Sequence, residues 1–287
     1  MPAALFFIMM AMGMELGVAD FKRVFTQPRA ILTGVLGQIF VLPAFAVGLV
    51  IALPLPDELA IGLVILAACP GGAMSNVISY LARADTALSI SMTAISSVLN
   101  VVSLPLLVNL ALHVFADGKD TSVQLPIGMT MAQLAILTFI PVGIGMWLHL
   151  KRPHVVTRII RRIKQAATIV FILVVLLTFA SVSEKLIAYV QAAALHAFIM
   201  GIASTFVGYG LARVVKLPPI QRVTIAVEFC IQNVAMATFV AINLLNAEQY
   251  GAFAGIYGIV CLLVILPALS IYRRATGFDR DDLQPGA

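Results

Sequence analysis

The sequence predicts an all-α protein that crosses a membrane many times. Hydrophobic residues make up 61% of its 287 residues, charged residues only 11%, and the mean hydropathy is +1.05. A soluble domain carries about 25% charged residues, so most of this chain must be surrounded by lipid. The apolar residues also fall into runs of about 20 residues, the length of a transmembrane helix. We therefore expect a single transmembrane domain over residues 1–287, without a soluble insert.

Nine apolar runs account for nearly the whole chain, and short polar loops separate them. The expected spans are 2–18, 30–53, 58–82, 86–115, 126–149, 166–183, 188–212, 219–245 and 249–272. The first run has no basic segment before it, so a cleaved signal peptide is not expected.

The basic residues predict how these spans are oriented. Sixteen of the 18 Lys and Arg residues fall on one side when the loops are assigned alternately to the two sides. The sixteen are Lys22, Arg23, Arg29, Arg83, Lys151, Arg152, Arg158, Arg161, Arg162, Lys164, Arg213, Lys216, Arg222, Arg273, Arg274 and Arg280, against Lys119 and Lys185. Because cytoplasmic loops are rich in Lys and Arg, the N-terminus is expected outside and the C-terminus in the cytoplasm. The net charge of +5 thus reflects membrane topology and not nucleic-acid binding.

Two spans contain features that interrupt a helix. Span 58–82 contains Cys69-Pro70-Gly71-Gly72, and proline removes a backbone donor and clashes with the preceding turn. Span 219–245 contains Glu228, Gln232 and Asn233 within six residues. Glu228 lies about ten residues into its span, which is roughly 15 Å along a helix and close to the bilayer midplane. Freed backbone groups at this depth must face protein or a wet cavity.

The two interrupted spans occupy corresponding positions in the chain. Each is the third of a set of four spans, and the two sets begin on opposite sides of the membrane. This arrangement predicts an inverted-topology repeat, in which paired broken helices mark a binding site near the midplane.

The polar residues inside the spans favour a hard cation. A charged residue at the bilayer centre costs about 2.5–3.5 kcal/mol on insertion scales, and no buried Lys or Arg is available to pair with Glu228. The other polar residues within the spans supply oxygen atoms: Gln38, Ser75, Asn76, Ser89, Thr93, Gln232 and Asn233. Hydroxyl, amide and carboxylate oxygens without thiolate or imidazole favour sodium over a transition metal.

Each of these features has a simpler structural explanation when taken alone. Ser89 and Thr93, four residues apart on one helix face, could bond to carbonyls of their own helix. The Pro70-Gly71-Gly72 segment could be a packing kink. Glu228 could be a neutral, hydrogen-bonded acid. Together, however, these explanations must account for two interruptions and a carboxylate at matching places, which favours a binding site.

The same geometry predicts the charge of the transported solute. Helices that begin at the midplane point their partially positive N-termini towards it. We expect the backbone amides around Ala73 and Asn233 to be free to bind a carboxylate. One carboxylate can be held in this way, so a small monocarboxylate is the expected substrate.

At these residues the sequence resembles the bile acid:sodium symporter family, and the resemblance covers nearly the whole chain. It is strongest over 12–16, from Cys69 through Leu81, which begins with the motif C-P-G-G-x-x-S-N, and over E-x-x-x-Q-N from Glu228 through Asn233. The resemblance implies a panel domain of spans 2–18, 126–149 and 166–183. It also implies a core domain of the other six spans, in which the two broken helices cross.

The resemblance further implies two sodium sites and a nearby substrate site. The first sodium site would use Ser75, Asn76, Ser89, Thr93 and Glu228. The second would use Gln38, Glu228, Gln232 and the backbone carbonyls of Phe229 and Ile231. Asn233 would contact the substrate, and Ala73 would do so through its backbone.

Three departures from the family pattern bear on these expectations. Some members have ten spans, and this sequence starts where their second span would begin. Members that handle bile acids carry polar residues in the last span, whereas Ile259-Val260-Cys261-Leu262-Leu263 is apolar. Many members have a hydroxyl where Ala73 stands.

The expected function is sodium-coupled symport of a small organic anion by alternating access. A proton-coupled carrier in which Glu228 titrates is the alternative within transport, and a membrane-embedded sensor or enzyme is the alternative outside it. No nucleophile–base pair or signalling domain is visible, so an enzyme is not expected. Cys69, Cys230, Cys261 and His196 are interpreted as packing residues. A monomer is the working expectation, and the sequence leaves the oligomeric state and the sodium stoichiometry open.

Overall fold

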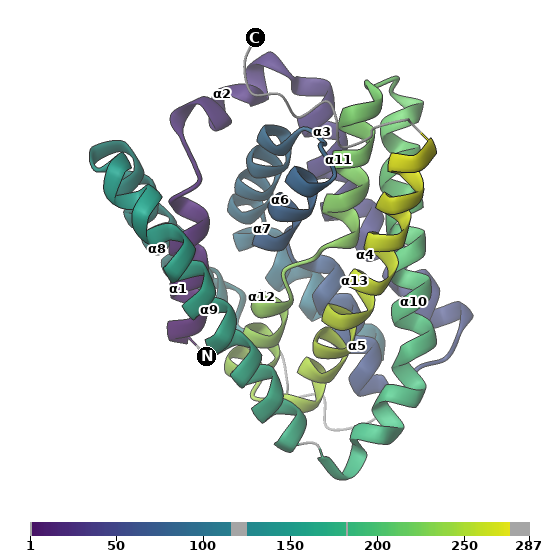
Figure 1. The fold of residues 1–287 in the computed structure, drawn as a ribbon. Coiled ribbons are helices and arrows are strands. Elements are labelled where there is room, and N and C mark those ends of the chain that lie inside the picture. Colours follow the sequence, from purple (N-terminus) through teal and green to yellow (C-terminus); the bar gives the residue numbers. More distant parts are fainter. Residues whose placement is uncertain (1, 116–124, 182, 276–287) are drawn as a thin grey trace.

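The computed structural model describes residues 2–115, 125–181 and 183–275, and the regular elements in these ranges are helices (Figure 1). In chain order they are α1 (Pro2–Gly13), α2 (Val18–Thr26), α3 (Pro28–Leu36), η1 (Gly37–Val41), α4 (Leu42–Ala52), α5 (Asp57–Ala68), α6 (Ala73–Leu81), α7 (Thr86–Phe115), α8 (Ile127–Lys151), α9 (Pro153–Ser181), α10 (Ser183–Val214), α11 (Pro219–Cys230), α12 (Val234–Phe239), η2 (Val240–Leu244) and α13 (Glu248–Ala275). The two elements labelled η are single turns of π-helix.

Five helical stretches in the described ranges are long and apolar enough to cross a bilayer, and the bent pair α1–α2 would make a sixth. The five are 28–52, α7, α8, α10 and the first 25 residues of α13. The chain is therefore a polytopic α-helical membrane protein. Helices α5 and α11 have 12 residues each, or about 18 Å, so neither can cross a bilayer alone. Each is followed, after a short break, by a second helix.

The first span ends earlier than the sequence predicted. Helix α1 stops at Gly13 rather than residue 18, and the chain bends by 68° into α2. The Gly17 amide donates to the Asp20 carboxylate at 2.8 Å, which fixes the start of α2. Lys22 and Arg23 therefore lie on this short polar helix and not in a loop, because a segment this rich in charge cannot continue an apolar span.

The sixth span begins earlier than predicted. Helix α9 starts at Pro153 and not at residue 166, so Arg158, Arg161 and Arg162 are helical and not part of a loop. Proline is favoured at the first position of a helix, and arginine is a good helix former. At 29 residues, α9 is about 44 Å long. It thus exceeds the roughly 30 Å hydrocarbon core, and its basic turns extend beyond the apolar part. Lys119 and Arg280 lie outside the described residues.

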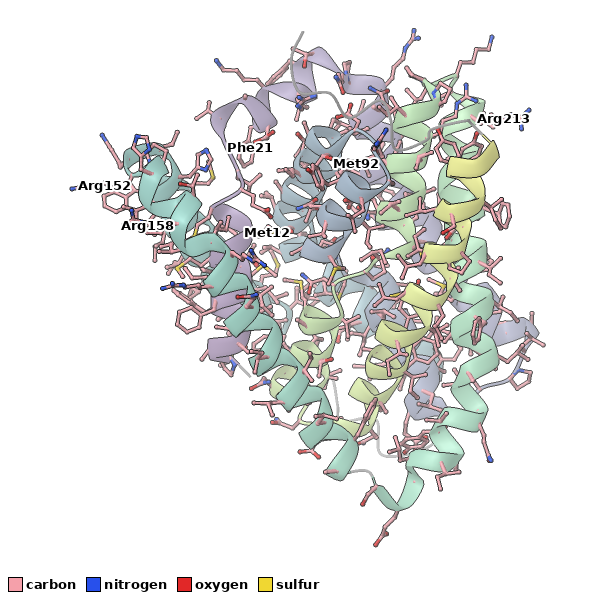
Figure 2. All side chains as sticks on the ribbon, in the orientation of Figure 1. Met12, Phe21, Met92, Arg152, Arg158 and Arg213 are labelled. Carbon is pink, nitrogen blue, oxygen red and sulfur yellow. The ribbon has the colours of Figure 1, made fainter. Side chains whose placement is uncertain are left out.

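Helices α1, α8 and α9 pack together on one side of the molecule (Figure 1). The remaining helices surround the two interrupted spans, which are α5 with α6 and α11 with α12. Helices α1 and α8 approach closely at Gly13 and Gly145, where a β-carbon would overlap the main chain of the opposite helix. Figure 2 shows Arg152 and Arg213 on opposite flanks but towards the same end of the molecule. The membrane orientation that the basic residues favour stays a prediction.

Candidate functional site

The two predicted interruptions are present, and they lie against each other at the centre of the fold. Between α5 and α6 and between α11 and α12, the chain is extended and forms an antiparallel bridge that pairs Gly71 with Gln232. The Gly72 amide donates to the Ile231 carbonyl at 3.1 Å, and the Asn233 amide donates to the Pro70 carbonyl at 2.9 Å. Figure 1 shows α5 and α12 in one half of the molecule and α6 and α11 in the other. We call this crossing of the two breaks the crossover.

A carboxylate lies beside the crossover. Glu228, in the last turn of α11, has no exposed surface. Ser75 on α6 lies 2.6 Å from its Oε1, and Thr93 on α7 lies 3.2 Å from Oε1 and 3.1 Å from Oε2. Ser89, one turn before Thr93, also donates to Oε1. Two helices distant in sequence from α11 therefore direct three hydroxyl groups at one buried carboxylate.

This carboxylate cluster contains more oxygen lone pairs than protons. Ser75 Oγ is also 2.7 Å from the Gly72 carbonyl, and Ser89 Oγ is 2.9 Å from Asn76 Oδ1. A hydroxyl carries one proton, so it can donate to only one of its two oxygen neighbours. The remaining close contacts join oxygen atoms without a proton between them. A small cation that accepts these lone pairs would satisfy them.

The hydroxyls of Ser89 and Thr93 do not bond to their own helix, in contrast to others on α7. Ser91 and Ser97 donate to the carbonyls four residues earlier, at 2.7 and 2.6 Å. Ser89 and Thr93 donate instead to side chains on α6 and α11. The structural explanation that the sequence left open for this pair is therefore wrong.

A second group of oxygens lies on the main-chain side of Glu228. Gln38 Nε2 donates to the Glu228 carbonyl at 3.0 Å, and Gln232 Nε2 lies 3.2 Å from the same carbonyl and 2.7 Å from the Phe229 carbonyl. Both glutamines are buried, and in the described part of the chain neither Oε1 atom has a hydrogen-bond partner. Two unsatisfied amide oxygens beside freed carbonyls fit a second cation.

Glu228 contributes different atoms to the two groups of oxygens. Its carboxylate faces the three hydroxyls, whereas the glutamines contact its main-chain oxygen. The sequence had assigned the carboxylate to both sites. Gln38 itself lies in the π-helical turn η1, where the Leu42 amide bonds to the Gly37 carbonyl five residues back. Such turns are frequent at functional sites.

The expected backbone contacts of the substrate are only partly available. Asn233 is buried, and its amide already donates to Pro70, so the expectation that this amide is free is wrong. Its side-chain oxygen accepts from the Met236 amide at 3.0 Å and caps α12. Ala73 begins α6 and is half-buried. The first N–H groups of a helix lack intrahelical acceptors, so the start of α6 remains suited to an anion.

The sequence reasoning named Gly71 only as part of a helix interruption and missed Tyr257, and both residues shape the crossover. A β-carbon on Gly71 would overlap Glu228 Oε2, so this glycine permits the close approach of the two breaks. Tyr257 on α13 has no exposed surface and donates its hydroxyl to the Cys230 carbonyl at 2.7 Å. A tyrosine inside an apolar span is a usable signal, because a buried tyrosine hydroxyl generally has a partner.

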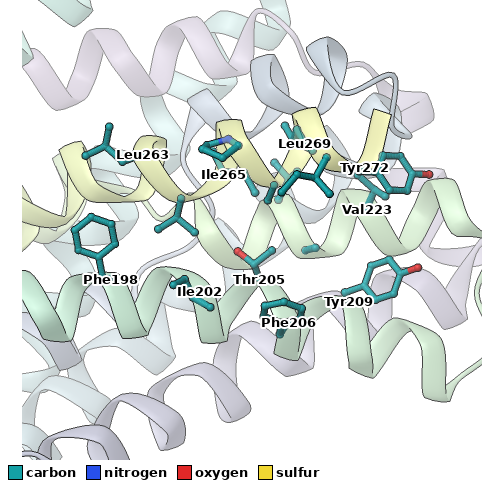
Figure 3. A pocket seen from close by; sticks show the side chains of 16 residues that line it. Phe198, Ile202, Thr205, Phe206, Tyr209, Val223, Leu263, Ile265, Leu269 and Tyr272 are labelled. Atoms are coloured by element: carbon teal, nitrogen blue, oxygen red, sulfur yellow. The ribbon is translucent and has the colours of Figure 1, made fainter. Parts of the chain in front are cut away.

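A large apolar groove lies apart from the crossover, between α10, α11 and α13 (Figure 3). Its volume is about 590 Å³, and side chains such as Phe198, Ile202, Leu263 and Leu269 line it. The oxygen ligands around Glu228 do not line this groove. The groove is therefore a separate feature from the candidate cation sites.

Comparison with known proteins identifies the family. Residues 2–189 match the model of the Sodium Bile acid symporter family. The chain is 43% identical over 103 residues to the uncharacterized sodium-dependent transporter YocS of Bacillus subtilis, covering 36% of this chain and 32% of that protein. It is 32% identical over 238 residues to human sodium/bile acid cotransporter 4, covering 82% and 54%.

A plant relative aligns with nearly the whole chain. The probable sodium/metabolite cotransporter BASS2 of rice chloroplasts is 28% identical over 285 residues, covering 97% of this chain and 65% of that protein. Each alignment spans less than two thirds of the relative's own length. The family match extends over well over half of this chain, including the first break and the hydroxyls of α7. This polytopic protein therefore belongs to the Sodium Bile acid symporter family, a family of membrane transporters and not of enzymes.

Proposed function

We propose that this protein is a secondary transporter that couples the entry of sodium to symport of a small organic anion. The observation that carries the proposal is the excess of oxygen lone pairs around the buried Glu228 carboxylate, where three hydroxyls make six contacts with four other oxygen atoms. Family membership and relatives named as sodium-dependent transporters support sodium as the coupling ion.

Two sodium ions are assigned to the two groups of oxygens. The first ion would bind Ser75, Asn76, Ser89, Thr93 and the Glu228 carboxylate. The second would bind the unsatisfied oxygens of Gln38 and Gln232 together with carbonyls freed by the break, those of Phe229 and Ile231 among them. Hydroxyl, amide, carbonyl and carboxylate oxygens are the ligands that hard cations prefer. Glu228 belongs to both groups, through its carboxylate in the first and its main-chain carbonyl in the second, so binding of the two ions is interdependent.

The substrate is assigned to the side of the crossover where α6 begins. The α6 N-terminus carries partial positive charge, and Ala73, Met74 and Val77 on this helix are not fully covered by protein. Asn233 contributes its side-chain amide, while its oxygen remains the cap of α12. Such a site provides for one carboxylate, so a small monocarboxylate, such as a keto or hydroxy acid, is the proposed substrate.

Transport would occur by movement of two domains against each other. Helices α1, α8 and α9 form the panel, and α3–α7 with α10–α13 form the core that carries the crossover. The nine spans of this arrangement form an inverted repeat, with the breaks after α5 and α11 in equivalent places. The protein would lie in the cell membrane with its N-terminus outside and its C-terminus in the cytoplasm, as the basic residues at one end of the molecule favour.

The decisive experiment removes the Glu228 carboxylate. Glu228→Ala and Glu228→Gln should abolish sodium-dependent thermal stabilisation of the purified protein and sodium-driven uptake, because the first site loses its only formal charge and the second site is joined to it through Glu228. Ligands that bind the native state raise its stability, so sodium against potassium gives a direct readout. Glu184→Gln, which changes an exposed carboxylate at the start of α10, is the matched control. Sodium-driven uptake at the wild-type rate in either Glu228 variant would refute the proposal.

The same preparation tests the substrate and the alternative coupling ion. Thermal stability is measured with a panel of carboxylates, once in sodium and once in potassium. Monocarboxylates should stabilise the protein more than dicarboxylates do, and this stabilisation should occur only in sodium. A clear preference for a dianion would show that the anion site is wrongly placed. Uptake that proceeds without sodium and follows a pH gradient would replace the sodium-coupled proposal with a proton-coupled carrier.

A further inference from the structure

The break between α11 and α12 frees a series of main-chain carbonyls that a continuous helix would satisfy. In an α-helix the amide of residue i+4 donates to carbonyl i, so Val234 would donate to Cys230. Instead, the Val234 amide donates to the Gln232 carbonyl at 3.0 Å, and the Asn233 amide donates to Pro70. The carbonyls from Glu228 to Ile231 must therefore find other partners.

Three of these four carbonyls face the crossover. Gln38 and Gln232 donate to Glu228, Gln232 also donates to Phe229, and the Gly72 amide donates to Ile231. The fourth carbonyl, that of Cys230, accepts from the Tyr257 hydroxyl on α13 at 2.7 Å. Tyr257 thus satisfies the one carbonyl of the series that neither glutamine nor the first break reaches.

A peptide unit is planar, so fixing one of its atoms fixes the whole plane. The Tyr257 hydroxyl donates to the oxygen of the Cys230–Ile231 peptide. The N–H of the same peptide, which belongs to Ile231, donates to the Val227 carbonyl at 2.9 Å. This plane lies between the Phe229 and Ile231 carbonyls, which are the main-chain ligands proposed for the second sodium ion. Its orientation therefore decides where those two carbonyls point.

We propose that Tyr257 is a positioning residue for sodium binding: its hydroxyl fixes the Cys230–Ile231 peptide and so keeps the Phe229 and Ile231 carbonyls directed at the second ion. The role rests on the proposed function, because it presupposes that the second ion binds these carbonyls. Preorganised ligands avoid the cost of ordering the site at the moment of binding. Loss of the hydroxyl should thus weaken sodium binding without removing a ligand.

The tyrosine ring is held rigidly, as a positioning residue requires. It stacks on Phe253 with ring centroids 6.4 Å apart and an interplanar angle of 20°, and neither side chain is exposed. One turn further along α13, the Cys261 carbonyl lies 3.8 Å from the Cys230 thiol. A β-carbon on Gly62 of α5 would lie 3.1 Å from the Phe253 β-carbon. The part of α13 that carries Tyr257 is therefore packed against both broken spans.

The test is a sodium titration of Tyr257→Phe, which removes the hydroxyl and keeps the ring. Thermal stability of the purified full-length protein is followed from potassium into rising sodium, and uptake is measured at limiting and saturating sodium. We expect the sodium midpoint to rise about tenfold, equivalent to ~1.4 kcal/mol. The maximal uptake rate at saturating sodium should stay within about twofold of the wild type, because every proposed ligand is still present. Tyr272→Phe on the same helix, about 22 Å away, should leave the midpoint unchanged.

Two outcomes would overturn the positioning role. One is a wild-type sodium midpoint in Tyr257→Phe; an equal loss of stability in potassium and in sodium would then indicate that the hydroxyl serves packing alone. Phe253→Leu keeps the Tyr257 hydroxyl but removes the ring that stacks on Tyr257, so it should shift the sodium midpoint less than Tyr257→Phe does. An equal or larger shift would assign the effect to the stacking of the two rings and not to the hydroxyl. Absence of any sodium effect on the wild-type protein would instead refute the proposed function itself.

Discussion

The two broken spans reach the same shape by different means. Between α5 and α6 the break contains Pro70, Gly71 and Gly72, residues that interrupt a helix by their own chemistry. Between α11 and α12 the break contains Ile231, Gln232 and Asn233, none of which prevents a helix. The first break is encoded locally, whereas the second depends on contacts made to it from elsewhere.

The contacts that hold the second break come from the rest of the fold. The first break supplies an amide and a carbonyl to it, Gln38 on η1 and Tyr257 on α13 satisfy freed carbonyls, and Gln232 and Asn233 complete the set from within. A helix can be interrupted in a bilayer only where other groups satisfy its backbone. Substitutions in the two breaks should therefore have different consequences.

The largest effect is expected at Gly71. In Gly71→Ala the new β-carbon would overlap Glu228 Oε2 and lie 3.3 Å from Thr93 Oγ1, so the carboxylate must leave the hydroxyls. We expect complete loss of sodium-dependent stabilisation and uptake, measured by thermal shift and transport in proteoliposomes. Gly48→Ala in α4 has open space around it and should keep both activities, with stability raised by up to ~1 kcal/mol. Sodium binding by Gly71→Ala would show that the breaks can separate without loss of the first site.

A smaller but clear effect is expected at Gln232. Gln232→Ala leaves the Phe229 carbonyl without its amide donor and removes a proposed sodium ligand. The unsatisfied buried carbonyl should cost about 1–3 kcal/mol of unfolding free energy, and the sodium midpoint should rise as well. Gln221→Ala, at a half-buried position near the start of α11, should change neither quantity appreciably. If Gln232→Ala lowers stability but not sodium affinity, then Gln232 supports the break and is not a ligand.

An intermediate effect is expected at Asn233, where capping and substrate binding must be separated. Asn233→Ser keeps a side-chain oxygen that can cap α12 but removes the amide nitrogen. Asn233→Ala removes both and should cost about 1 kcal/mol more in stability. If the amide binds the substrate, both variants should lose substrate affinity in equilibrium binding measurements, with sodium affinity nearly unchanged in the serine variant. A serine variant that binds substrate like the wild type would leave Asn233 as a helix cap only.

The smallest effect is expected at Pro70. The bridge uses the Pro70 carbonyl and the Gly72 amide, and alanine provides the same carbonyl. Pro70→Ala should therefore keep the break, the sodium midpoint and the uptake rate, and should lose only about 0.4–1 kcal/mol through the greater freedom of the unfolded chain. A large rise of the sodium midpoint in this variant would mean that the first break also depends on the proline ring.

The membrane character and the main ligand candidates could be read from the sequence because each depends on local or compositional properties. Hydropathy determines which segments lie in lipid, and a carboxylate at membrane depth is costly enough to mark a site by itself. The positions of the two breaks followed from Pro70-Gly71-Gly72 and from the polar run beginning at Glu228. The ends of α1 and α9 were misplaced, because charged residues were taken to mark loops although they can also lie on helices.

The sequence by itself thus determined that this protein is a helical membrane protein, where its helices are interrupted and which oxygens lie in the interruptions. Only the tertiary structure decided which atoms of Glu228 contact which group of oxygens, that the Asn233 amide is already paired, and that Tyr257 on α13 donates to a carbonyl of the second break. The physical reason is the distance along the chain over which each interaction acts. Hydropathy and helix breaking act over a few residues, whereas the hydrogen bonds of a freed carbonyl can join residues 190 positions apart, as those of Gln38 and Glu228 do.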